Sequence, residues 1–301
     1  MIISASRRTD IPAFYSDWFL KRIAEGFVMV RNPMNARQVS RVSLEQEAVD
    51  CIVFWTKNPA NMINKLKDLD QKNYNYYFQF TLTPYDKTIE PNLPAKDDVV
   101  STFIELSKRI GKERVIWRYD PILITNELDR KYHYQSFESL AGKLAGHTDK
   151  CIISFVDFYD KCRKRLMSLN AREISREDMY AIAQTFAGIG KANDIKIETC
   201  AEEADLAELG IAHGKCIDDE LISRIIGRPL EVKKDKSQRE LCGCGASFDV
   251  GAYNTCFFNC LYCYANHGSE AVTAKTALHN IDSPLLSGDT EDGDKITIKI
   301  D

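Results

Sequence analysis

The sequence predicts an α/β fold: a (β/α) TIM-like barrel of seven or eight parallel strands, with a cysteine-rich, cluster-binding segment on its C-terminal side. Three observations support this prediction. Short apolar runs alternate with amphipathic helical patterns, polar or charged residues follow the runs, and no glycine-rich dinucleotide fingerprint follows any of them. The length of 301 residues suits one large α/β domain. A doubly wound open sheet is the alternative, because local sequence does not determine strand order.

Seven apolar runs are the expected strands. They cover residues 2–5, 27–30, 51–55, 76–80, 115–117, 151–155 and 195–197. An eighth, shorter strand is expected within residues 214–218, with its end at Cys216. The nearly continuous apolar character of these runs indicates strands that are buried on both faces, as in a parallel sheet covered by helices.

The segments between the runs carry residues typical of helix ends. Serine, asparagine or aspartate caps the free N–H groups at a helix start, and glycine ends a helix by adopting the left-handed conformation. Helices are expected from Ser16 to Gly26, after Asn58-Pro59, from Phe103 to Gly111, from the capping box Ser175–Asp178 towards Gly188, and from Asp218 to Gly227.

Composition shifts divide the chain into four parts. We expect a barrel domain over residues 1–227, a basic linker over 228–240, a cysteine-rich cluster-binding segment over 241–267 and an acidic, extended tail over 268–301. The net charge is −4, and the stretch 279–301, with six acids and two lysines, accounts for all of it. The remaining body is neutral, which disfavours generic nucleic-acid binding.

The sequence also bears on location and on the class of chemistry. No run approaches the roughly 18 apolar residues of a membrane span, and no export signal is recognisable, so a cytoplasmic protein without membrane contact is expected. Ten cysteines in such a chain suit metal ligands better than disulfides. None of the five histidines stands in a recognisable catalytic triad context, and His133, His147 and His213 are expected to be solvated or to cap helices.

The strongest motif is Cys256, Cys260 and Cys263, a C-x3-C-x2-C spacing. Three thiolates this close can bind three irons of one [4Fe–4S] cluster and leave the fourth iron open. Zinc is the alternative, with the final two cysteines among its ligands and His267 as the fourth. The cluster is favoured because this spacing is uncommon for zinc.

Four further cysteines form a candidate second metal site. Cys200 and Cys216 fall at predicted strand ends, and Cys242-Gly-Cys244 lies just upstream of the main motif. Together they could bind a second cluster or a zinc ion. Alternatively, Cys200 and Cys216 are small buried hydrophobic residues, which is the commonest role of a free cysteine.

Charged side chains at the predicted strand ends are the candidate catalytic and substrate-binding residues. They are Arg7, Arg8, Asp10, Lys57, Arg118, Asp120 and Glu202. Arg31 and Asp157 also follow predicted strands and are expected at the same rim. Active sites of barrels lie at the carboxyl ends of the strands, where the basic groups would bind a phosphate or carboxylate and the acids would orient donors or substrate hydroxyls. The alternative is that the basic groups pair internally with these acids and contribute only to stability.

Seven segments together resemble a bacterial family described as domain of unknown function 1848. They are residues 4–13 (SASRRTDIPA), 54–59 (FWTKNP), 78–85 (FQFTLTPY), 117–122 (WRYDPI), 199–202 (TCAE), 242–244 (CGC) and 255–265 (TCFFNCLYCYA). The stretch 256–265 also resembles the cluster motif of spore photoproduct lyase and related radical S-adenosylmethionine enzymes. This resemblance implies Cys256, Cys260 and Cys263 as cluster ligands, S-adenosylmethionine as co-substrate, and a flavodoxin or ferredoxin as electron donor.

The chain departs from the radical enzymes in two respects. In those enzymes the cysteine loop follows the first barrel strand, whereas here it follows the last expected strand, and a Gly-Gly-Glu motif is absent. The expected function is an iron–sulfur enzyme of the radical S-adenosylmethionine type, acting on an anionic small molecule or nucleotide-like substrate. The alternatives are a non-catalytic iron–sulfur or zinc protein in electron transfer or redox sensing, and a barrel hydrolase with a structural zinc.

Overall fold

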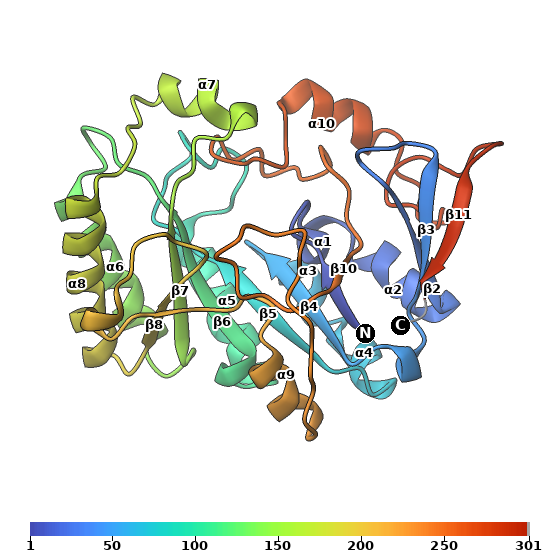
Figure 1. Cartoon of the computed structure of the whole chain (residues 1–301), viewed down its shortest axis with the longest axis horizontal. Helices are drawn as coiled ribbons and strands as arrows, with labels where there is room; N and C mark the ends of the chain where they lie inside the picture. The colour runs from blue at the N-terminus through green and yellow to red at the C-terminus, as the bar shows by residue number, and fades with distance from the viewer. Residues whose placement is uncertain (300–301) are drawn as a thin grey trace.

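A computed structural model describes residues 1–299 and has a mixed α/β architecture (Figure 1). Its main sheet has eight strands, all parallel, in the order β10-β1-β4-β5-β6-β7-β8-β9. The strands are β1 (Ile2–Ala5), β4 (Cys51–Thr56), β5 (Tyr76–Thr81), β6 (Val115–Ile122), β7 (Lys150–Phe155), β8 (Lys196–Thr199), β9 (Ala212–His213) and β10 (Phe248–Asp249). The predicted parallel sheet is therefore confirmed.

The helices include all five that were predicted, one of them divided in two, and four that were not predicted. They are α1 (Ile11–Phe14), α2 (Ser16–Glu25), α3 (Ala60–Ile63), α4 (Leu66–Gln71), α5 (Lys96–Ile110), α6 (Arg130–Leu144), α7 (Asp160–Ser168), α8 (Arg176–Ala192), α9 (Asp219–Ile226) and α10 (Ser269–Thr276). The Ser175 side chain caps α8 by accepting from the Asp178 N–H, and α2 and α9 end at left-handed glycines. Among the described residues, no helix is long and apolar enough to cross a membrane.

One predicted strand of the main sheet belongs to a different sheet. Residues 27–31 form β2, which pairs antiparallel with β3 (Gln38–Ser43), and β11 (Lys295–Lys299) adds to the other edge of β3. Residues 32–37 turn the chain back as a hairpin between β2 and β3. In β2 only Val28 is fully buried, because the three-stranded sheet packs against the rest of the protein with one of its faces only.

The eight-strand count is reached with different strands than predicted. The expected strand within 214–218 is wrong, because β9 ends at His213 and the residues after it form a turn. The missing strand is β10, which pairs Phe248 with Ile3 and Asp249 with Ser4. The last strand of the main sheet in chain order thus lies beside the first, at one edge of that sheet.

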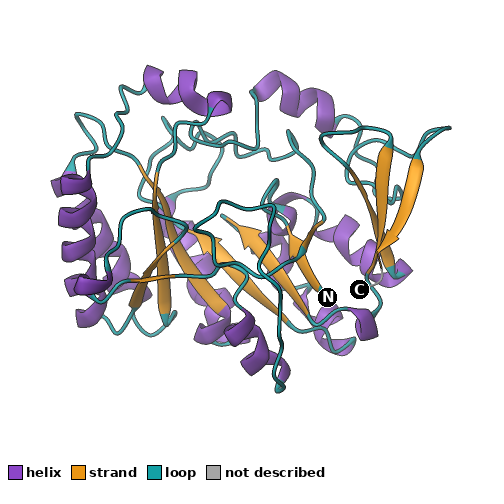
Figure 2. Ribbon diagram, viewed as in Figure 1, coloured by secondary structure: helices purple, strands orange, loops and turns teal. Residues whose placement is uncertain are grey.

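The segments after α9 are more structured than a linker and an extended tail. Figure 2 shows long loops between α9 and α10, and these loops cross the middle of the molecule in the view of Figure 1. The cysteine-rich segment contributes β10 to the main sheet, while the predicted tail contains α10 and β11. Tail acids hold other elements: the Asp294 carboxylate lies 2.7 Å from Arg31 of β2. Residues 300–301 of the predicted tail lie outside the described residues.

The core fixes the strand ends around which the site is built. The strands β4 and β5 are buried along almost their whole length. On the outer face of the sheet, Trp117 of β6 stacks on Phe137 of α6, which stacks on Phe186 of α8 at 3.8 Å between ring centroids. Offset aromatic stacks of this kind hold helix and strand in a fixed relation. The polar residues just beyond the strands are therefore carried on a rigid frame.

His133 is fully buried, which corrects the expectation of a solvated side chain. It lies in the first turn of α6, and its ring nitrogens are 2.9 Å from the Tyr119 hydroxyl and 2.7 Å from the Leu123 carbonyl oxygen. Burial lowers the pKa of His133 to about 4, from an ordinary value of 6.5. The folded protein therefore resists protonation of this ring, whereas the unfolded chain accepts the proton near pH 6.5.

We expect the free energy of unfolding to fall as the pH is lowered from about 6.5 to 4, by about 3 kcal/mol from His133 alone. The contribution is complete above pH 6.5, because the ring is then neutral in both states. Urea unfolding at pH 7.5, 5.5 and 4.5 measures this change in the free energy of unfolding. His133→Gln, which keeps a donor and an acceptor, should lose less stability over this interval. Parallel pH profiles for the two proteins would contradict the assignment.

Candidate active site with two cysteine groups

A cavity of about 460 Å³ lies at the carboxyl ends of the parallel strands. This is where α/β proteins bind ligands. Six of the seven predicted catalytic residues line it, namely Arg7, Arg8, Asp10, Lys57, Arg118 and Asp120. Seven cysteines line the same cavity, namely Cys200, Cys216, Cys242, Cys244, Cys256, Cys260 and Cys263. The structure thus brings both predicted cysteine groups and most of the predicted charged rim to one place.

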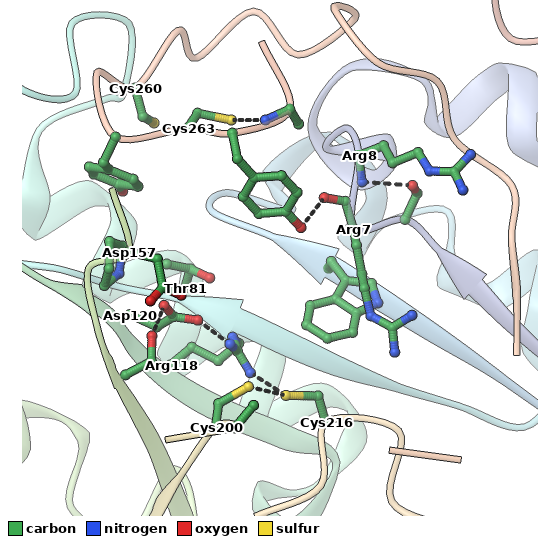
Figure 3. Close-up of a pocket in the computed structure, with 18 of the residues that line it drawn as sticks. Arg7, Arg8, Thr81, Arg118, Asp120, Asp157, Cys200, Cys216, Cys260 and Cys263 are labelled. Carbon is green, nitrogen blue, oxygen red and sulfur yellow. Dashed lines mark hydrogen bonds and ion pairs between the residues drawn. The ribbon is translucent and has the colours of Figure 1, made fainter. Parts of the chain in front are cut away.

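The two cysteine groups lie on opposite sides of this cavity. Figure 3 shows Cys260 and Cys263 on one side, Cys200 and Cys216 on the other, and Asp120 between them. We call Cys256, Cys260 and Cys263 the upper group and Cys200, Cys216, Cys242 and Cys244 the lower group. By contrast, Cys51 and Cys151 are buried within strands, and Cys162 is buried in α7. None of these three cysteines lines the cavity.

The loop that carries the upper group is held by one arginine. Arg165 of α7 donates to four backbone carbonyl oxygens, those of Leu261, Cys263, Asn266 and His267, at 2.5 to 2.9 Å. A guanidinium is suited to this task because its five N–H donors form a rigid planar fork. Sequence reasoning missed Arg165, since a basic residue on a polar helix is normally a solvated one.

Further contacts lie within the same loop and between the segment before it and the loop after β1. The Asn266 amide donates to the Cys256 carbonyl at 2.7 Å, and the Ala265 N–H donates to Cys263 Sγ at 3.3 Å. Near the start of the loop, Gly251 packs so closely on Ser6 that an added Cβ would lie 2.1 Å from the serine Oγ. Glycine is required there because the backbone beyond β10 lies against the loop after β1.

Burial controls the protonation of the upper thiols. It raises the pKa of Cys256, Cys260 and Cys263, and that of Cys260 reaches about 12 although Lys57 opposes the shift. Without a bound cation these thiols are protonated at neutral pH, so metal binding must release their protons. The sulfur donors are of the kind that iron–sulfur clusters use.

The lower group is joined by direct contacts between its members. Cys200 Sγ lies 3.4 Å from Cys216 Sγ, and Cys244 Sγ accepts from the backbone N–H of Cys216 at 3.2 Å and of Ile217 at 3.5 Å. The hydrogen bond from Cys216 lowers the pKa of Cys200 to about 7, against the effect of burial. This group therefore contains a thiol that ionises much more readily than those of the upper group.

Two buried arginines stand between the cysteine groups. Arg118 and Arg7 both lie over the Trp55 ring, at 5.2 and 5.1 Å from its centroid. Arg118 contacts Cys216 Sγ at 2.7 Å and pairs with Asp120, which also accepts from Ser154. Nη2 of Arg7 is buried and has no hydrogen-bond partner among residues 1–299. A buried donor left free in this way is available to an anionic ligand.

Glu90 organises the basic side chains on the upper side. Its fully buried carboxylate accepts from Lys57 at 2.6 Å and from Thr83 at 2.7 Å, and it also contacts Lys96 and the Tyr262 hydroxyl. Burial alone would raise the pKa of Glu90, but the two lysines outweigh it and bring the pKa to about 2. Sequence reasoning proposed Lys57 as an anion-binding residue and missed its partner Glu90.

The remaining rim residues have mainly structural partners. Asp10 caps α1 through the Ala13 N–H at 3.0 Å and accepts from the Lys57 N–H at 2.6 Å, and burial raises its pKa to about 7. Glu202 does not line the cavity; its carboxylate accepts from the Phe155 N–H at 2.9 Å, and burial raises its pKa to about 7. Arg31, in β2, pairs with Asp294 instead of joining the rim.

No three Cys, His, Asp or Glu side chains within residues 1–299 are gathered in the arrangement of a completed metal site. The donors are nevertheless of the right kind and face one cavity, so binding would require the thiols to close around the metal. His267, the proposed fourth zinc ligand, is exposed and is not part of the cavity lining.

Comparisons with known proteins identify the family and nothing finer. Comparison with curated proteins finds no significant match, and neither does comparison with solved structures. The sequence model of one family matches residues 2–265, which span β1 through the last cysteine of the upper group. The chain therefore belongs to the family Domain of unknown function (DUF1848).

Proposed function

We propose that the chain is an iron–sulfur enzyme of the radical S-adenosylmethionine type, with a [4Fe–4S] cluster held by Cys256, Cys260 and Cys263. The observation that carries the proposal is that these three thiols sit on one loop and line a cavity together with buried arginines. The proposed substrate is an anionic small molecule or a nucleotide-like compound. A flavodoxin or ferredoxin is the proposed electron donor.

The strand order supports this proposal. In chain order the cysteine loop follows the last strand, unlike the radical enzymes that its motif resembles. In the sheet, however, β10 is the edge strand and β1 is its neighbour. Counted from that edge, the cysteine loop follows the first strand, as in those enzymes. We further propose that the sheet curves into an open TIM-like barrel around the cavity, with β10 and β9 at its two edges.

The residues of the cavity have distinct proposed roles. A bound and reduced cluster of this type supplies the electron that cleaves the sulfonium of S-adenosylmethionine. Lys57 provides positive charge near Cys260, which favours the thiolate form needed for binding iron. The free Nη2 of Arg7 and the guanidinium of Arg8 are the donors for a carboxylate or phosphate. Asp120, held by Ser154, is an acceptor for a substrate hydroxyl.

The proposal is tested by measuring iron and acid-labile sulfide after anaerobic purification. We expect about four of each per chain, and none in a variant with Cys256, Cys260 and Cys263 all changed to Ser. The reduced protein should cleave S-adenosylmethionine to 5′-deoxyadenosine, and the triple variant should not. Cys162→Ser is the matched control, because this cysteine is buried in α7 and does not line the cavity.

Two results would separate the parts of this proposal. Iron and sulfide without cleavage of S-adenosylmethionine would leave an electron-transfer or redox-sensing protein. Zinc in place of iron, after anaerobic cluster reconstitution has also failed, would overturn the proposal and leave a zinc protein, with a hydrolase as the next activity to assay. Circular dichroism of the triple variant distinguishes loss of the cluster from loss of the fold.

A further inference from the structure

We propose that the lower group, Cys200, Cys216, Cys242 and Cys244, is a second metal site that binds one zinc ion. This inference does not rest on the proposed cluster or on radical chemistry. It rests on the convergence of four thiols from separate parts of the chain, on the spacing of their sulfurs and on the charges around them.

Three segments contribute to this site. Cys200 directly follows β8, Cys216 lies in the turn between β9 and α9, and Cys242-Gly-Cys244 belongs to the segment that leads to β10. The Gly243 backbone packs on Lys215, since an added Cβ would lie 3.3 Å from the lysine Cγ. The segment with Cys216 and the segment with Cys242 and Cys244 are further joined by the Gly245 N–H, which donates to the Ile217 carbonyl at 3.0 Å. The convergence is therefore fixed by the backbone.

The sulfur spacing favours a single ion over a cubane. A tetrahedral zinc with metal–sulfur bonds of about 2.3 Å has sulfur–sulfur edges of about 3.8 Å. The Cys200 and Cys216 sulfurs, 3.4 Å apart, are close to such an edge. A cubane binds each thiolate to a separate iron and so holds its ligands farther apart. Cys242 and Cys244 would supply the other two corners of the tetrahedron.

The surroundings of the lower group suit an anionic metal complex. Four thiolates around Zn²⁺ carry a net charge of −2, which is costly to bury unless it is neutralised. Arg118 contacts Cys216 Sγ at 2.7 Å. Arg7, whose Nη2 has no hydrogen-bond partner among residues 1–299, lies over the same Trp55 ring as Arg118. The backbone N–H groups of Cys216 and Ile217 donate to Cys244 Sγ. Such donors stabilise and orient thiolate ligands.

The experiment measures zinc and iron per chain in four proteins purified with zinc in the growth medium. We expect about one zinc in the wild type, about one in the Cys256/Cys260/Cys263→Ser variant, and none in Cys242→Ser/Cys244→Ser. Cys162→Ser is the control and should keep its zinc. Retention of zinc by the triple variant, even if it binds no iron, separates this inference from the proposed function.

Cobalt provides a test that does not depend on the stability of any variant. Wild-type protein stripped of zinc and loaded with Co²⁺ should show the visible absorption of a tetrahedral tetrathiolate complex. Absence of zinc and of this absorption in the wild type would overturn the proposal. So would full zinc occupancy in the folded Cys242→Ser/Cys244→Ser variant. Additional iron and sulfide that disappear in that variant would replace the zinc by a cluster and equally overturn it.

Discussion

Replacing Arg165 with alanine is expected to release the cysteine loop from α7. The side chain makes four hydrogen bonds to loop carbonyls, and each bond from a charged donor contributes on the order of 1.5 to 3 kcal/mol before non-additivity. We expect a loss of about 3 kcal/mol in the free energy of unfolding. The carbonyls of Leu261 and Cys263 lose their donor, so the loop no longer holds the proposed cluster ligands in place. We therefore expect iron per chain to fall by more than half.

Hydrogen exchange gives a readout of Arg165→Ala that does not depend on the bound metal. Amides of the loop, residues 254–267, should exchange faster in the variant, while those of β5 and β6 should be unchanged. Arg163→Ala is the matched control, because this arginine is on the same helix, is exposed, and makes no contact with the cysteine loop: it faces Asp160 at 4.0 Å and lies over the Phe158 ring at 5.8 Å. Equal loop exchange in the two variants would show that Arg165 does not hold the loop.

Replacing Glu90 with glutamine is expected to be the most destabilising single change at the cavity. The neutral amide would leave two partly buried lysines, Lys57 and Lys96, without their shared counter-charge. Breaking a buried ion pair on one side costs about 3 to 5 kcal/mol. Asp97→Asn is the control, since this exposed carboxylate pairs with Lys143 on the surface, and its loss should leave the free energy of unfolding nearly unchanged.

The Glu90 carboxylate also makes the stability of the folded protein depend on pH, with stability decreasing as the pH falls. The pKa of Glu90 is about 2 in the folded protein and near 4.5 in the unfolded chain. The contribution of the Glu90 carboxylate to the free energy of unfolding is therefore complete above pH 4.5 and declines as the pH falls towards 2. Chemical denaturation of wild type and Glu90→Gln at pH 7 and pH 3.5 should give a smaller difference at the lower pH. A difference that does not change with pH would disprove the role of its charge.

Local signals predicted most of the fold. Caps such as Ser175 and stops such as Gly227 act within a few residues, so they can be identified without knowing the tertiary structure. The buried parallel strands were recognisable for the same reason. By contrast, β2 has the composition of a core strand, but it pairs with β3, which in turn pairs with the distant β11, and these pairings assign it to another sheet. The two residues of β10 are too few to form a pattern.

The candidate site was predictable in outline only. Residues that follow parallel strands must meet at one edge of the sheet, so the shared location of Arg7, Arg118 and Cys200 follows from the fold. Partner choice does not follow from it. Whether Lys57 binds a ligand or Glu90, and whether Arg165 is solvated or holds a loop, depends on side chains that approach only after folding.

The position of β10 beside β1 has a consequence for how the protein is made. The side chain of Ser4 bonds to Asp249, 245 positions later, so the edge of β1 stays unpaired until nearly all of the family region has left the ribosome. Contacts this distant in sequence close slowly, and an open strand edge can pair wrongly in the meantime. Both cysteine groups are complete only when the same late segment has docked. A metal at either proposed site would therefore be inserted after synthesis, and the nascent chain exposes its thiols and a bare sheet edge at the same time.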